Sequence, residues 1–154
     1  ERVERLVLEG PVTPGAGLSV VAETFAQTRR ALLTDGLDAA RAVWWSAGCW
    51  YRLIKRDPDT RRAAEQRAIL DGFGGAPWRA PPPQDAAAAI GARIGTITSP
   101  TLIYNGELDD PEFTDAATAL AARLPNVVAT QIPDTGGFPA WERPAAVNAR
   151  VAAF

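Results

Sequence analysis

The sequence has no histidine, no methionine and a single cysteine, Cys49. One cysteine excludes a disulfide within the chain, which favours a reducing compartment, so we expect a cytoplasmic protein. Because there is neither a histidine nor a CxxC pair, no zinc-binding pattern is present, and we expect no metal and no other cofactor. The net charge is −2 and the basic residues are spread along the chain, so we expect no nucleic-acid partner. No apolar run approaches the ~20 residues of a membrane-spanning helix, so we expect no membrane partner either.

The length of 154 residues suits one domain, and a hydrophobic content of 47% is ordinary for a globular protein. The first residue is Glu1 and no methionine occurs anywhere, so we expect the sequence to be part of a longer polypeptide. No targeting signal can be read from such a sequence.

The hydrophobic periodicity predicts an α/β protein in which helices alternate with strands. We expect Asp38 and Asp57 to cap helices, the latter followed by proline at the first helical position, and Gly72 to end a helix before a Gly- and Pro-rich loop at 72–83. The predicted strands are 3–8, 101–104 and 126–132, and the predicted helices are 18–33, 38–54, 57–71, 85–93, 113–124 and 144–154. This order implies parallel strand pairing with right-handed crossovers.

Three parallel strands are an incomplete sheet. The first of them begins at the N-terminus of the sequence, and at an open edge it would present apolar side chains and unpaired backbone groups. We therefore expect an upstream segment or a separate chain to supply the missing strands.

Two segments near the C-terminus carry the most specific pattern, residues 100–109 (PTLIYNGELD) and 132–139 (IPDTGGFP). They resemble the acid-bearing and histidine-bearing segments of α/β-hydrolases. Three further segments resemble that family in the same order: residues 1–8 (ERVERLVL), the lead into the acid strand from Ile94, and Glu142-Arg143-Pro144 with the helix after it.

The resemblance implies the C-terminal part of an α/β-hydrolase fold, with three parallel strands and a helical cap insertion, and with the N-terminal strands absent from this chain. Residues 1–12 and 94–154 would form the core, and residues 13–93 the helical cap, or lid, with its linker. The Gly-x-Ser-x-Gly elbow that carries the nucleophile would lie upstream. Ser46 faintly resembles that elbow, but it lacks the leading glycine and follows a predicted helix, so we interpret it as a small residue of the cap.

The resemblance assigns Asp109 as the catalytic acid and places Gly137 where the catalytic histidine stands. The alternative for Asp109 is a helix-capping role, for which the position of Asp110 is better suited. Gly137 is explained by an engineered replacement, by a natural pseudoenzyme or non-triad relative, or by a turn that only resembles the histidine segment. The flanking Ile132-Pro133 and Phe138-Pro139 argue against the third explanation.

Three tryptophans within seven residues, Trp44, Trp45 and Trp50, mark the predicted cap. They are expected either to pack the cap or to line an apolar substrate pocket beneath it. Leu108 and Phe138 are further substrate-binding candidates beside the predicted site. Cys49 fits a small buried residue better than a nucleophile.

Two classes of function follow. In the first, the chain is part of a hydrolase for an ester, thioester, lactone or activated C–C bond of a small apolar molecule, and it is not competent alone because it lacks nucleophile and base. Its partners would be that small molecule and the N-terminal half of the fold. In the second, the protein is a pseudoenzyme or ligand-binding member of the fold, or a non-hydrolytic relative of the cyclase or lyase type.

Overall fold

The computed structural model describes residues 3–13, 16–80 and 91–154. They fall into two compact units, one within residues 1–16 and 84–154 and the other within residues 17–83. The division predicted from the sequence lay after residue 12 and after residue 93.

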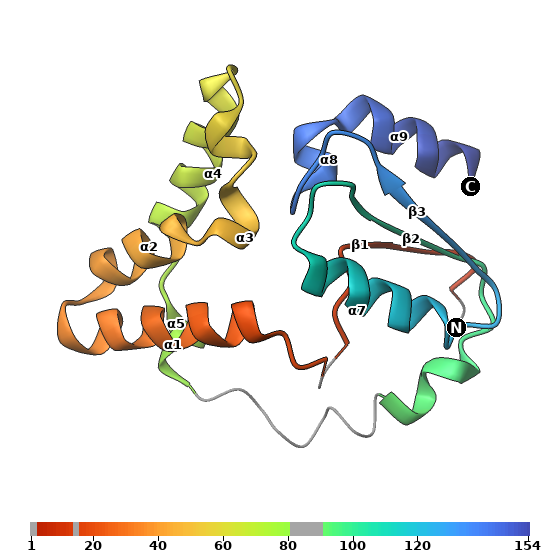
Figure 1. The fold of residues 1–154 in the computed structure, drawn as a ribbon, viewed down its shortest axis with the longest axis horizontal. Coiled ribbons are helices and arrows are strands. Elements are labelled where there is room, and N and C mark those ends of the chain that lie inside the picture. Colours follow the sequence, from red (N-terminus) through yellow and green to blue (C-terminus); the bar gives the residue numbers. More distant parts are fainter. Residues whose placement is uncertain (1–2, 14–15, 81–90) are drawn as a thin grey trace. The chain divides into compact units, whose positions relative to one another are not determined.

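A parallel sheet of three strands, in the order β1-β2-β3, forms the centre of the first unit (Figure 1). The strands are β1 (Leu6–Glu9), β2 (Thr101–Gly106) and β3 (Val127–Ile132). Glu9 is aligned with Tyr104, and Gly106 with Ile132, so the carboxyl ends of all three strands lie on the same edge of the sheet. The prediction of three parallel strands is confirmed, although the first begins at Leu6 rather than at residue 3.

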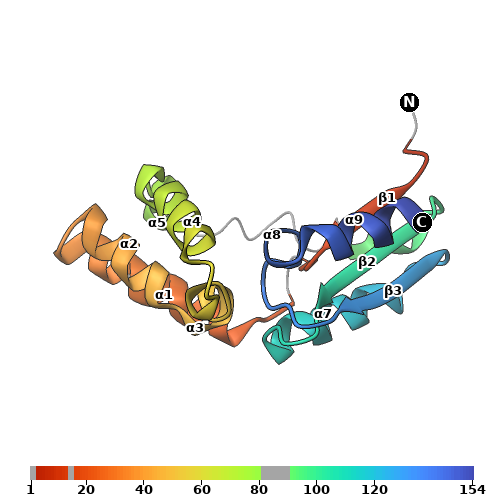
Figure 2. The ribbon, with the colours of Figure 1, turned by 90° about the horizontal axis from the view of Figure 1, so that it is seen from above.

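One helix covers each face of this sheet. Figure 2 shows the strands between α7 (Pro111–Ala121) and α9 (Pro144–Ala153). Successive side chains of a strand point to opposite faces, so Ile103 packs on the α7 side and Leu102 packs with Val147 of α9. All six residues of β2 are buried, which makes it the central strand of the core.

The outer edge of β1 lies open among the described residues, because β1 pairs with β2 alone. Its Val7 side chain is 38% exposed, although strands of parallel sheets are normally buried on both faces. The described part of the sheet is therefore incomplete at β1.

The second unit is helical. It consists of α1 (Ser19–Thr34), α2 (Leu37–Ser46), α3 (Gly48–Tyr51), a 3₁₀ turn at Ile54–Arg56, α4 (Thr60–Gly72) and α5 (Ala76–Arg79). Its core contains Ala40, Leu70 and Trp78, against which Trp44 and Trp45 pack. None of the helices described in either unit is both long enough and apolar enough to cross a membrane.

Several predicted helix ends were wrong. The helix predicted over 38–54 breaks at Ala47, which has an extended ψ of 123°. Asp38 lies inside the first turn of α2, whose N-cap is Gly36 with φ of 91°, a conformation that favours glycine. The described part of the loop predicted over 72–83, residues 72–80, contains the short helix α5, and residues 81–83 lie outside the described residues. Of the helix predicted at 85–93, residues 85–90 lie outside the described residues and 91–93 are helical.

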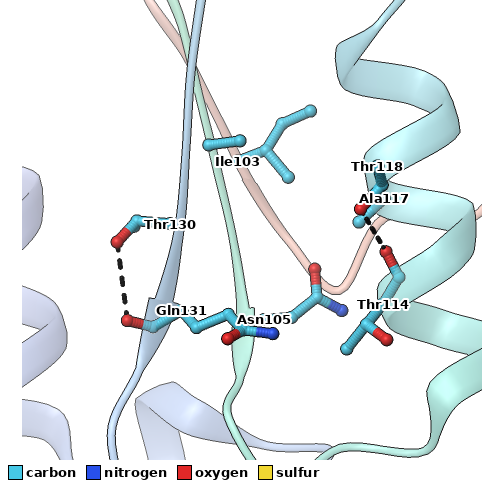
Figure 3. A pocket seen from close by; sticks show the side chains of 8 residues that line it. Ile103, Asn105, Thr114, Ala117, Thr118, Thr130 and Gln131 are labelled. Atoms are coloured by element: carbon cyan, nitrogen blue, oxygen red, sulfur yellow. Dashed lines mark hydrogen bonds between the residues drawn. The ribbon is translucent and has the colours of Figure 1, made fainter.

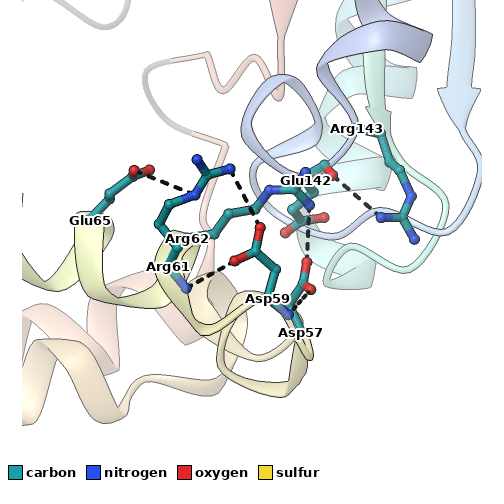
Figure 4. A network of polar contacts seen from close by, with 7 residues as sticks. All are labelled: Asp57, Asp59, Arg61, Arg62, Glu65, Glu142 and Arg143. Atoms are coloured by element: carbon teal, nitrogen blue, oxygen red, sulfur yellow. Dashed lines mark hydrogen bonds and ion pairs between the residues drawn. The ribbon is translucent and has the colours of Figure 1, made fainter.

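The N-cap of α4 is Asp59, not the predicted Asp57. The Asp59 side chain accepts a hydrogen bond from the Arg61 backbone N–H at 3.2 Å. Asp57 instead forms an ion pair with Arg62 at 3.0 Å, and Figure 4 shows this pair beside Arg61, Asp59 and Glu65. An aspartate two residues later caps the helix because Asp57 uses its carboxylate to bind Asp59 N–H and Arg62.

Candidate active site

The turn after β2 and the turn after β3 are joined by backbone hydrogen bonds at the carboxyl edge of the sheet. Glu107 N–H donates to the carbonyl of Ile132 at 3.0 Å, and Leu108 N–H donates to the carbonyl of Thr135 at 2.8 Å. A Cβ at Gly106 would lie 2.2 Å from the Gly136 carbonyl oxygen, so only glycine fits there. The two segments that the sequence singled out therefore lie against each other.

Asp109 lies in the first of these turns and is half-buried. Its Oδ1 accepts from the Asp110 backbone N–H at 2.8 Å, and its Oδ2 accepts from the Asn105 side-chain amide at 3.3 Å. Asp110 caps α7, because its side chain accepts from Glu112 N–H at 3.1 Å. The preference for Asp110 as the cap is confirmed, and the catalytic role of Asp109 stays a prediction.

Gly137 lies in the loop after β3 and is half-buried, as is Phe138. Asp134, the second residue after β3, has a φ of 55°, a left-handed conformation that turns the chain sharply. Asp134 N–H donates to the Glu107 carboxylate at 3.2 Å, and the buried Thr135 hydroxyl donates to the Ile132 carbonyl at 2.8 Å. These bonds hold the segment that leads into position 137.

Glu142 is a feature of this site that the sequence analysis did not identify. It lies at the end of α8 (Pro139–Glu142), and its side chain is buried with 4% exposure. Its carboxylate accepts hydrogen bonds from the backbone N–H groups of Gly136 and Phe138, on both sides of Gly137. The sequence had marked this glutamate only as part of the closing segment, since burial and N–H partners have no local sequence signal.

The pKa of Glu142 is raised. Burial is the main cause, and the nearby Asp109 carboxylate adds to it, whereas the two N–H donors and Arg143 act in the opposite direction. Figure 4 shows Glu142 and its neighbour Arg143 in close view. The Asp109 and Glu142 carboxylates of the first unit therefore interact electrostatically, and Gly137 lies in the loop whose backbone Glu142 binds.

A second polar contact, at the partly buried Tyr104 hydroxyl, joins the end of β1 to α8. The Tyr104 hydroxyl donates to the Glu9 carboxylate at 2.7 Å, and Ala140 N–H donates to the same oxygen at 3.3 Å. Burial raises the pKa of Tyr104, and the bound carboxylate raises it further. Glu9 therefore connects two strand ends with the segment that follows the Gly137 loop.

The predicted cap tryptophans pack against aromatic rings of the helical unit. Trp44 stacks on Trp50 with ring centroids 4.3 Å apart, and its ring meets the edge of Phe25 at 5.0 Å. Trp45 contacts Tyr51 at 4.6 Å. Their role in substrate binding stays a prediction.

The remaining candidates differ in exposure. The Leu108 side chain is 44% exposed, and Cys49 is buried. In the part of the chain that the structure describes, no group of three or more histidine, cysteine, aspartate or glutamate residues could hold a metal ion.

No model of a protein family matches the sequence, and no curated protein matches it. Solved structures do resemble the fold. MenH from S. aureus is 18% identical over 98% of this chain, with a TM-score of 0.67. A hydrolase from Pseudomonas aeruginosa is 21% identical over 99% of the chain (TM-score 0.69), and an esterase from Thermogutta terrifontis is 20% identical over 99% (TM-score 0.65).

The chain spans only 58%, 55% and 55% of these three structures. Together with the three parallel strands and their helices, this match shows that the chain has the α/β-hydrolase fold and corresponds to its C-terminal part. At these identities the similarity is one of fold.

Proposed function

We propose that this chain supplies the acid and the base-position loop of an α/β-hydrolase-type active site. The substrate would be a small apolar molecule with an ester, thioester, lactone or activated C–C bond. The observation that carries this proposal is the hydrogen-bonded pairing of the Asp109 turn with the Gly137 loop. It lies at the carboxyl ends of parallel strands, which is where open α/β sheets bind their ligands.

The chemistry of such a site needs groups that this sequence does not contain. A serine hydroxyl becomes a competent nucleophile only when a neighbouring base takes its proton, and an acid must orient that base. Asp109 supplies the acid, but Gly137 has no group that accepts a proton and the sequence has no histidine. The chain by itself is therefore not a triad enzyme.

We propose that the N-terminal half of the same fold supplies the nucleophile, either from an upstream segment or from a separate chain. The open edge of β1 and the coverage of 55–58% of the three solved structures support this proposal. The helical unit would act as the cap, with Trp44, Trp45 and Trp50 as its apolar lining candidates. Leu108 and Phe138 are the substrate-binding candidates of the sheet unit, beside the Asp109 turn and position 137.

The test restores the base in the complete protein that contains this sequence. Gly137→His should produce hydrolysis of p-nitrophenyl esters, and adding Asp109→Asn should abolish that gain. Gly74→His is the matched control, because it adds a histidine at an exposed glycine with open space around its Cβ position. In the unmodified protein, imidazole should raise ester turnover in proportion to its concentration. A folded Gly137→His protein without turnover would refute the hydrolase proposal.

The absent histidine favours a second candidate, in which the fold binds a ligand or catalyses a non-hydrolytic cyclase- or lyase-type reaction. The supporting observation is that Glu142 anchors both sides of Gly137 although residue 137 has no side chain. An upstream segment that lacks the elbow serine would support this candidate over the first.

A further inference from the structure

A pocket outside the Gly137 loop lies between α7 and strands β2 and β3, with a volume of about 310 Å³. This volume is at the lower end of the range of small-molecule sites, so it suits a compact ligand. Its polar side chains are Asn105, Thr114, Thr118 and Gln131 (Figure 3), whereas the Thr130 side chain points away from α7, where its hydroxyl accepts a hydrogen bond from Arg150 of α9.

The lining determines the charge of a suitable ligand. None of the residues that line the pocket is acidic or basic. A charged ligand would therefore find no opposite charge among the residues that line the pocket, whereas a neutral ligand needs none. The apolar remainder of the lining, Ile103, Ala117 and Ala129, offers a contact for a short aliphatic group.

Two side-chain amides give the pocket its hydrogen-bonding character. Asn105 and Gln131 extend from β2 and β3 toward α7 (Figure 3). Asn105 is only 3% exposed, and its Nδ2 donates to the Asp109 carboxylate at 3.3 Å. The same amide therefore contacts both the pocket and the candidate catalytic acid.

We propose that this pocket binds a small neutral carboxamide and that Asn105 transmits its occupancy to Asp109. A carboxamide carries N–H donors and a carbonyl acceptor, and these complement the amides of Asn105 and Gln131. Its aliphatic part packs on Ile103, Ala117 and Ala129. The inference concerns a site separate from position 137 and does not depend on hydrolysis.

The test is a titration of the complete, isotope-labelled protein with propionamide, followed by NMR. The side-chain amide signals of Asn105 and Gln131 should shift to saturation, and the Asp109 carboxyl carbon signal should shift with the same dissociation constant. Propionate and propylamine, which have the same chain length but carry a charge, should give no saturable shift.

Thr118→Leu should fill the pocket and weaken propionamide binding by about tenfold or more, a clear change in dissociation constant. Ala119→Leu is the matched control, because residues 118 and 119 are both exposed on α7 but Ala119 does not line the pocket. Gln131→Ala should weaken binding without filling the space. Three results would each overturn the proposal. The first is chemical shifts that rise linearly with propionamide concentration, and the second is binding of propionate as tight as that of propionamide. The third is the same affinity for propionamide in Thr118→Leu and Ala119→Leu. An Asp109 signal that stays unchanged at saturation would overturn the coupling.

Discussion

The backbone N–H of Gly136 donates a hydrogen bond to the carboxylate of Glu142, six residues further along the chain. Phe138 N–H donates to the same carboxylate, so this one side chain holds the backbone on both sides of Gly137. From the other direction, the Thr135 carbonyl accepts from Leu108 N–H at 2.8 Å. The position that lacks a base is thus held in place beside the turn that carries Asp109.

Removing the Glu142 carboxylate should loosen this loop. Glu142→Ala leaves the buried Gly136 N–H without its acceptor, which should cost about 1–3 kcal/mol of stability. Hydrogen exchange at the Gly136 and Phe138 amides should accelerate, whereas Glu65→Ala on the exposed surface of α4 should leave both amides protected. Unchanged exchange at both amides in Glu142→Ala would contradict the anchoring role.

Glu142 should also make stability depend on pH. Its pKa in the folded protein is raised, so between the ordinary glutamate pKa of about 4.3 and this raised value the folded state binds more protons than the unfolded state. The stability contribution is therefore fully present below that window and is lost as the pH rises through the folded pKa. Urea unfolding across this range should show the decline in the unmodified protein and a flatter profile in Glu142→Gln. A decline of equal size in Glu142→Gln would assign it to another group.

Gly106→Ala should displace the loop through steric conflict. The new Cβ would lie 2.2 Å from the Gly136 carbonyl oxygen and 2.3 Å from that of Thr135, and backbone atoms cannot move away cheaply. We expect a loss of about 3 kcal/mol in denaturant unfolding, at the upper end of ordinary overpacking costs. Gly95→Ala is the control, because its nearest neighbour would be an ordinary 3.7 Å away. Equal stabilities for the two variants would show that the turns do not meet as closely as described.

Of the two adjacent aspartates, Asp110 should stabilise α7 as its N-cap, and Asp109 should not. Asp110→Ala should destabilise α7 by about 1 kcal/mol because it removes the N-cap acceptor, and Asp110→Asn should recover most of this loss. Asp109→Asn should leave the protection of α7 amides in hydrogen exchange unchanged. If Asp109→Asn weakens α7 as much as Asp110→Ala, then Asp109 has a capping role.

Both tyrosines should resist ionisation in the folded protein. The chain has two, Tyr51 and Tyr104, and burial is the main cause that raises the pKa of each. Ultraviolet absorbance should therefore show no phenolate at about pH 10, the ordinary tyrosine value, until the protein unfolds. Because the folded pKa values lie above the unfolded ones, stability should fall as the pH rises beyond that value. Glu9→Gln should lower the pKa of Tyr104 alone, and reversible ionisation of both tyrosines near pH 10 would contradict their burial.

The sequence predicted the three strands well because each is a run of apolar or β-branched residues bounded by Gly, Pro or Asn. Helix ends were predicted less well where several residues could serve as caps. Asp57 and Asp59 are chemically equivalent candidates, and the ion pair of Asp57 with Arg62 is visible only in three dimensions. The break at Ala47 has a local signal in Gly48, since glycine is a poor helix former, but the sequence alone did not show that it ends one helix and begins another.

At the candidate site too, some features were predictable from the sequence and others only from the tertiary structure. The sequence by itself determined the α/β class, the resemblance of the Asp109 and Gly137 segments, and the absence of any histidine, because these depend on residue identity and order. Only the tertiary structure decided that Glu142 binds the backbone on both sides of Gly137 and that Asn105 connects Asp109 with a pocket beside α7. Burial and hydrogen-bond partners arise when segments far apart in sequence pack together, and a linear pattern does not record them.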